Sequence, residues 1–253
     1  MGMSRRWLLV LLAALVTPAV GSGASCGARA ETVTVDALMA MDEPAFSDWF
    51  THYYRAPHPE LIRAAIRKVS QSGYLTDQNK VPPIAGFLAN AFAARPEALE
   101  QTVADAALAL PDQDFQVIQV IAILALNADP KQQGKLAGRL DAFGKRVLAW
   151  FEAAGIHGHD RVAAVSPYAL DFIWGAFFAT GDSDLVLPLV GAIADPKDQD
   201  VLHLMVSKAA NWSLGSNAQQ HPKILALCKA QIAQQPPEIA EKLKKIVAKA
   251  STP

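Results

Sequence analysis

An apolar pattern with the period of an α-helix runs through most of this chain and restarts repeatedly at proline-led segments. Phe46, Trp49, Phe50 and Tyr53 have the spacing i, i+3, i+4 and i+7, which places them on one side of a helix. Asp42 precedes them and is a favourable N-cap, because its carboxylate accepts a hydrogen bond from a free backbone N–H group. Proline near a helix start removes only an N–H group that has no partner there. Further starts are predicted at His58-Pro59, Pro82-Pro83, Arg95-Pro96, Asp129-Pro130, Ser166-Pro167, Asp182-Ser183-Asp184, Asp195-Pro196, His221-Pro222 and Pro236-Pro237.

Alternating strand patterns are almost absent after residue 42, so the sequence predicts an all-α fold. About ten or eleven helices of roughly 12–16 residues are expected, joined by turns of a few residues. Short turns make successive helices antiparallel neighbours. Helix pairs recur about every 35–40 residues, near the period of helical-repeat proteins. We therefore expect residues 31–253 to form antiparallel helix pairs, stacked as an α-solenoid or an irregular helical-repeat domain.

The composition excludes several classes of protein. Of the 253 residues, 51% are hydrophobic and 19% are charged, which excludes an intrinsically disordered chain. Two cysteines exclude a small disulfide-stapled scaffold. The formal net charge of −1 argues against a nucleic-acid-binding protein, because such proteins usually carry a strongly basic face.

The N-terminus has the layout of a secretory signal. Arg5 and Arg6 precede an apolar stretch at residues 8–16, which is too short to span a bilayer, and small residues follow. We expect residues 1–30 to be a signal peptide and the mature chain to be exported, most simply to the periplasm. Cleavage after Gly21 or after Ala30 both fit the small-residue rule.

A lipid anchor is a third alternative for the N-terminus. The segment Gly23-Ala24-Ser25-Cys26 resembles a bacterial lipobox before the cysteine, although Gly23 stands where leucine is usual. Lipidation of Cys26 would make the chain an outer-membrane lipoprotein, and the anchor would be its contact with a membrane. The C-terminal lysine-rich helix is instead expected to present a solvated face.

Residues 168–194 are expected to be the structural centre. Leu170, Ile173, Trp174, Phe177 and Phe178 lie on overlapping helical faces. A glycine at position 181 then permits the positive φ that ends a helix, and the next residues can cap the following helix.

This region also carries two resemblances. Residues 170–182, with their bulky apolar side chains followed by Gly-Asp and a second helix, resemble one tetratricopeptide unit, although Trp174 stands where that motif has a small residue. Residues 171–222 resemble a group of uncharacterised exported bacterial proteins. The first resemblance implies a helical repeat and the second supports export, and neither implies an activity.

Motifs for catalysis are missing from the sequence. There is no nucleophile elbow, phosphate-binding glycine loop, dinucleotide fingerprint or His-Glu-x-x-His motif, and no cofactor is implied. The one sequence cluster of residue types that ligate zinc is formed by His157, His159 and Asp160. A catalytic zinc needs three protein ligands in a fixed geometry. The favoured interpretation of this cluster is a polar surface loop. Cys228 lies in an apolar run and is expected to be a buried, inert thiol.

Four residues are candidates for binding a partner. Trp174 and Phe178 would line an open groove, although helical spacing favours the core for both. Trp212 and Asn217 are the other two candidates, and Asn217 is expected at a helix end, where it would satisfy free backbone groups or contact a partner.

The sequence as a whole favours a non-enzymatic, exported helical-repeat protein that binds a protein or peptide in the bacterial cell envelope. Stacked helix pairs build extended concave surfaces suited to this role. The alternative is a metal-dependent envelope hydrolase that uses the loop at residues 157–160.

Overall fold

The computed structural model describes residues 33–126, 129–196 and 200–251. Within these ranges the chain consists of helices joined by turns and loops, with an isolated bridge between Ile156 and Val162. The α-helices are α1 (Val35–Ala40), α2 (Glu43–His52), α3 (Ile62–Gln71), α4 (Val81–Ala93), α5 (Pro96–Ala109), α6 (Asp112–Ala125), α7 (Pro130–Ala137), α8 (Ala142–Ala153), α9 (Pro167–Thr180), α10 (Leu187–Ala192), α11 (Val201–Gln220), α12 (Pro222–Gln231) and α13 (Pro237–Ala250). Three 3-10 segments join them, namely η1 (Tyr53–Arg55), η2 (Pro59–Leu61) and η3 (Ser183–Val186). The predicted all-α fold of packed helices is confirmed for this part of the chain. The predicted signal peptide and Cys26 lie outside the described residues.

Side-chain caps fix several of the predicted helix starts. The Asp42 carboxylate accepts from the Ala45 N–H at 2.9 Å and begins α2. Asp129 accepts from the Gln132 N–H at 3.0 Å and begins α7. Ser166 Oγ accepts from the Ala169 N–H at 3.1 Å and begins α9. Each cap satisfies a backbone donor that the helix itself leaves without a partner.

The predicted helix start at Asp195-Pro196 is wrong. The next helix, α11, begins at Val201, and Asp200 caps it by accepting from the Leu202 N–H at 2.7 Å. Asp195 instead pairs with Lys242 of α13 at 2.6 Å, and its N–H donates to Glu238 at 2.5 Å. Asp195 and Pro196 therefore lie outside any helix, in contact with α13, and Asp200 takes the role of the cap. Helix lengths also vary more than expected, from 6 residues in α10 to 20 in α11.

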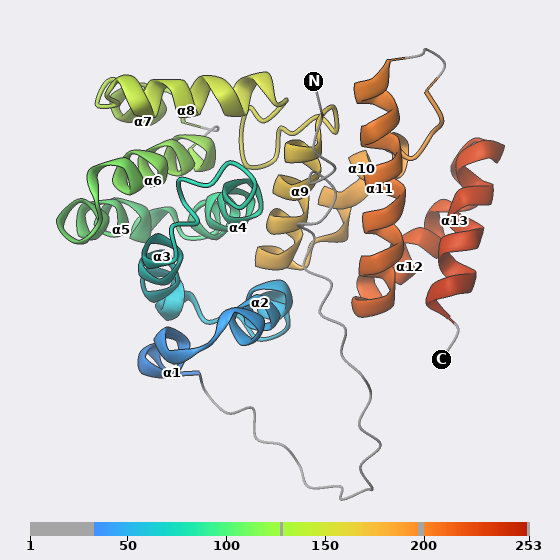
Figure 1. Cartoon of the computed structure of the whole chain (residues 1–253), viewed down its shortest axis with the longest axis horizontal. Coiled ribbons are helices and arrows are strands. Elements are labelled where there is room, and N and C mark those ends of the chain that lie inside the picture. The colour runs from blue at the N-terminus through green and yellow to red at the C-terminus, as the bar shows by residue number, and fades with distance from the viewer. Residues whose placement is uncertain (1–32, 127–128, 197–199, 252–253) are drawn as a thin grey trace, which may run out of the picture.

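Helices α4 and α9 lie side by side at the centre of the molecule (Figure 1). A Cβ atom on Gly86 would lie 1.9 Å from the carbonyl oxygen of Phe172. A Cβ atom on Gly175 would lie 1.9 Å from the carbonyl oxygen of Pro83. Each helix thus supplies a glycine where the other backbone touches it, and a side chain at either position would displace the neighbouring helix. Because distant parts of the chain meet here, the fold is more irregular than a solenoid in which each repeat contacts only its neighbours.

The other helices cover this pair from two sides. Helices α5 to α8 form a stack on one side, and α10 to α13 gather on the other (Figure 1). Within α6, residues 117–125 are all buried, as expected for the segment that is apolar on nearly all faces. The core of the molecule is therefore continuous from α6 through α4 and α9 to α11.

Residues 168–194 contain the predicted buried helix and its glycine stop, but not the predicted second full-length helix. Trp174 is 3% exposed and packs near Phe177 and Phe178. Gly181 ends α9 with φ 66°, and the Asp182 carboxylate accepts from the Asp184 N–H to begin η3. A short η3–α10 segment follows in place of a second full-length helix.

Candidate functional site

The loop at residues 157–160 is held mainly by backbone contacts. The His157 N–H donates to Arg161 O at 3.0 Å, and the His159 N–H donates to Leu124 O at 2.9 Å. Asn90 Nδ2 donates to the carbonyl oxygen of His159 at 3.2 Å. Among the described residues, no three His, Cys, Asp or Glu side chains are placed to hold a metal ion together. The metal-site hypothesis for His157, His159 and Asp160 stays a prediction.

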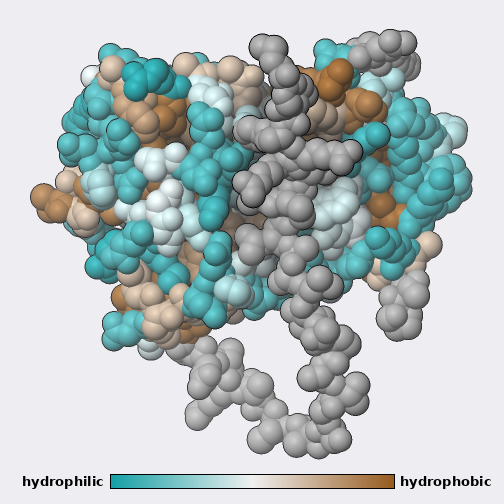
Figure 2. Space-filling model, in the orientation of Figure 1, coloured by the Kyte–Doolittle hydropathy of each residue, from teal (hydrophilic) through white to brown (hydrophobic). Residues whose placement is uncertain are grey.

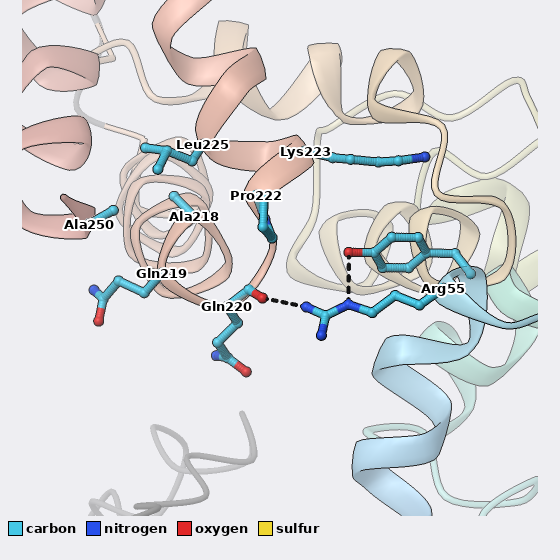
Figure 3. A pocket seen from close by; sticks show the side chains of 9 residues that line it. Arg55, Ala218, Gln219, Gln220, Pro222, Lys223, Leu225 and Ala250 are labelled. Atoms are coloured by element: carbon cyan, nitrogen blue, oxygen red, sulfur yellow. Dashed lines mark hydrogen bonds between the residues drawn. The ribbon is translucent and has the colours of Figure 1, made fainter. Parts of the chain in front are cut away.

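A shallow basic pocket of about 410 Å³ lies where the N-terminal and C-terminal parts of the chain meet. Its polar wall consists of Tyr54 and Arg55 from η1, Gln219 and Gln220 from α11, and Lys223 from α12. The apolar wall consists of Ala218, Pro222, Leu225 and Ala250. Figure 3 shows Arg55 reaching across from the N-terminal segment toward the end of α11. None of the described residues that line the pocket is acidic, so this lining suits an anionic group.

Both cations of the basic pocket are anchored on uncharged oxygen atoms. Arg55 donates through Nη2 to Gln220 O at 2.7 Å and through Nε to the Tyr54 hydroxyl at 3.5 Å (Figure 3). Lys223 Nζ donates to Gly181 O at 2.8 Å. Their charged groups lie 5.9 and 5.3 Å from the centre of the Tyr54 ring, so one aromatic ring places both cations. Neither cation pairs with a carboxylate among the described residues.

His221 lies beneath the basic pocket, at the junction of α11 and α12. Its side chain is 1% exposed and packs against Phe177 and Phe178 of α9. Burial, together with the charges of His52 and Arg55, lowers the pKa of His221 to about 3. The ring is therefore neutral at neutral pH. Its Nδ1 lies 3.2 Å from the Tyr54 hydroxyl, while its Nε2 is buried and has no hydrogen-bond partner among the described residues.

The contact between Tyr54 and His221 has a preferred direction. The Tyr54 oxygen receives a hydrogen bond from Arg55 Nε, so its own proton is free to be donated to His221 Nδ1. This assignment leaves the proton of the neutral imidazole on Nε2, the buried nitrogen. The chain of contacts from Arg55 through Tyr54 to His221 thereby ties the pocket wall to the core.

A second surface feature lies on α11, where five large apolar side chains are exposed. Val201 is 70% exposed and Met205 is 53% exposed, and both belong to the first turns of the helix. We define the α11 apolar row as Val201, Leu202, Leu204, Met205 and Trp212. Figure 2 shows hydrophobic residues gathered over the upper end of α11, as seen in Figure 1.

The structure separates the four candidate partner-binding residues. Trp174 and Phe178 lie in the core. Asn217 is also buried, inside α11, where its Nδ2 donates to Ser213 O at 2.9 Å. Trp212 alone among the four is exposed, at 48%.

Burial also raises the pKa of other titratable groups, among them Tyr53, Cys228 and Asp171. The Cys228 thiol is buried, and its pKa is raised to about 11 because burial disfavours the thiolate. That position suits an inert thiol, as the sequence predicts. The pKa of Asp171 in α9 is raised to about 7 by the removal of water from its carboxylate.

No family model, curated protein or solved structure matches this chain. In the described part of the chain, no helix is long and apolar enough to cross a membrane.

Sequence reasoning missed both the basic pocket and most of the α11 apolar row. The pocket residues come from positions 54–55, 218–225 and 250, and nothing local relates these segments. A signal for the row does exist in the sequence. Five of the six residues at positions 201–206 are apolar, and they point to several sides of the helix. A helix that packs on one face cannot bury all of them.

Proposed function

We propose that this chain is an exported, non-enzymatic helical-repeat protein that binds a protein partner through the α11 apolar row. The observation that carries the proposal is the exposure of five large apolar side chains within twelve residues of one helix, between Val201 and Trp212. Contiguous exposed apolar surface is uncommon on monomeric soluble proteins and marks interaction sites.

The distribution of exposed apolar residues supports this choice of surface. The other large exposed apolar side chains, Val35, Leu108, Val165 and Leu187, lie on four separate segments of the described chain. Scattered single residues of this kind are normal on protein surfaces. The α11 apolar row is a cluster, so it is the better candidate for a binding surface.

The proposed compartment depends on the N-terminal residues. The basic start, the short apolar stretch and the small residues before Glu31 support export, with Cys26 as an alternative lipid anchor. A bacterial origin and a tetratricopeptide-like unit at residues 168–196 are part of the same proposal. Sequencing the N-terminus of protein from the envelope fraction tests it. Mature protein should begin near Glu31 or at a lipidated Cys26, and an intact Met1 on cytosolic protein would contradict export.

Site-specific photo-crosslinking tests the binding surface. A photoreactive amino acid at Met205 of the full chain should give covalent adducts with a discrete protein when cells of the native host are irradiated. The matched control is the same amino acid at Leu108, which is more exposed than Met205 and belongs to α5. In Figure 1, α5 and α11 lie on opposite sides of the molecule. Adducts at Met205 that are absent at Leu108 support the proposal. No adduct at Met205, or the same adducts at both positions, would overturn it.

A further inference from the structure

The exposed side of α11 leads to the basic pocket. Val201 and Gln219 are about five helical turns apart, so they share one side of α11 at a separation of about 27 Å. Lys208 and Trp212 lie between them on the same side, and both are exposed. Gln219 is also part of the pocket wall. One continuous surface thus runs from the apolar first turns of α11 to the pocket.

Positive charge recurs along this surface. Lys208 is exposed between Met205 and Trp212 and forms no ion pair with any described residue. Arg55 and Lys223 stand at the pocket end and donate only to uncharged oxygen atoms. The nearest acidic group on α11 itself is the cap Asp200, whose carboxylate accepts the Leu202 N–H at the opposite end of the helix.

We propose that the partner segment is an acidic amphipathic helix, with apolar side chains on the α11 apolar row and carboxylates at Lys208 and in the basic pocket. This rests on the proposed function and names the chemistry of the partner. Such a helix would complement the surface in charge, because apolar contacts supply affinity while opposite charges select the partner and its register. Lys208, Arg55 and Lys223 have no carboxylate partner among the described residues, and their places at the middle and the end of this surface fit a segment that supplies carboxylates there.

The same charges argue against a second copy of this chain as the occupant. A two-fold antiparallel pairing of α11 with α11 would be centred between Met205 and Trp212. It would therefore place Lys208 near Lys208 of the other copy, inside the contact. Like charges in that position oppose association.

Synthetic peptides test the proposal on the mature full chain. The probes are three helical peptides of about 18 residues that share one leucine face and carry Glu, Gln or Lys at the positions flanking it. Affinity is measured by fluorescence anisotropy at low and high salt. The Glu peptide should bind about fivefold more tightly than the Gln peptide, the Lys peptide should bind most weakly, and high salt should reduce the difference.

Variants of the protein locate the effect. Lys208→Glu should reverse the order of affinity, so that the Lys peptide binds more tightly than the Glu peptide. Arg55→Gln should weaken the binding of the Glu peptide alone. Lys229→Glu, on α12 outside the pocket, is the matched control and should leave the order unchanged. Equal binding of the three peptides, no binding by any of them, or the same reversal in Lys229→Glu would overturn the proposal. Discrete adducts at Met205 would still support the proposed function in that case, so the two failures are distinguishable.

Discussion

Two apolar regions of this chain are used in opposite ways. In the α4–α9 contact, apolar side chains are buried and two glycines let the helix backbones touch. In the first turns of α11, apolar side chains of similar size are left exposed. Two tryptophans make the contrast direct, because Trp174 of α9 is buried and Trp212 of α11 is half exposed. Hydrophobicity alone therefore does not distinguish the folding core from a candidate binding surface, whereas the presence of a covering helix does.

The strongest test of the comparison places a methyl group in the α4–α9 contact. Gly175→Ala puts a Cβ against the backbone of Pro83, which cannot move without displacing α4. We expect a loss of more than about 4 kcal/mol in the free energy of unfolding, or failure to fold, measured by urea denaturation followed by circular dichroism.

Gly134→Ala in α7 is the control for this variant. A Cβ at Gly134 has no neighbour within 4 Å, and alanine favours a helix over glycine by about 1 kcal/mol, so stability should be kept or raised. If Gly175→Ala is as stable as Gly134→Ala, the two backbones are not in contact.

The two tryptophans provide the second test. Trp174→Ala should cost roughly 3–5 kcal/mol, because it leaves a cavity among packed aromatic rings. Trp212→Ala should change stability by less than about 0.5 kcal/mol, because half of its surface is already in water. Equal costs in thermal or urea unfolding would remove the distinction between core and surface.

Protonation probes the contact between the C-terminal end of α11 and the buried helix α9. His221 packs against α9, and burial lowers its pKa from the usual 6.5 to about 3 in the folded chain. Below pH 6.5 the unfolded chain takes up a proton that folded His221 does not, so stability falls as the pH drops toward 3. Between pH 7 and pH 4 the wild type should lose on the order of 3 kcal/mol more than His221→Gln. Parallel stability curves for the two proteins would show that His221 does not titrate in this way.

Helix caps give the smallest predicted differences. Ser166→Ala removes the cap of α9 and should cost about 0.5–2 kcal/mol. Asp195→Ala removes a partly exposed ion pair with Lys242 and should cost less, about 0–1 kcal/mol. Urea midpoints of the two variants test this order, and a larger loss for Asp195→Ala would indicate that its contacts with α13 contribute more than an ordinary surface pair.

The helices themselves were largely predictable from local signals. Proline after Asp129 or Ser166 placed the starts of α7 and α9 correctly, because a cap and the first turn involve only a few neighbouring residues. The same signal failed at Asp195, where a lysine 47 positions further along the chain holds the carboxylate. The basic pocket was unpredictable for the same reason, because Arg55 and Gln220 meet only in the folded chain.

By itself, the sequence determined that the chain is helical, where most helices begin and which segments are apolar, because period, caps and prolines act over a few residues. Tertiary structure decided that α4 pairs with α9, that Asp195 pairs with α13, and that the first turns of α11 remain uncovered. An apolar side chain is buried only if another element covers it, and the contacts that decide this join residues far apart in the chain.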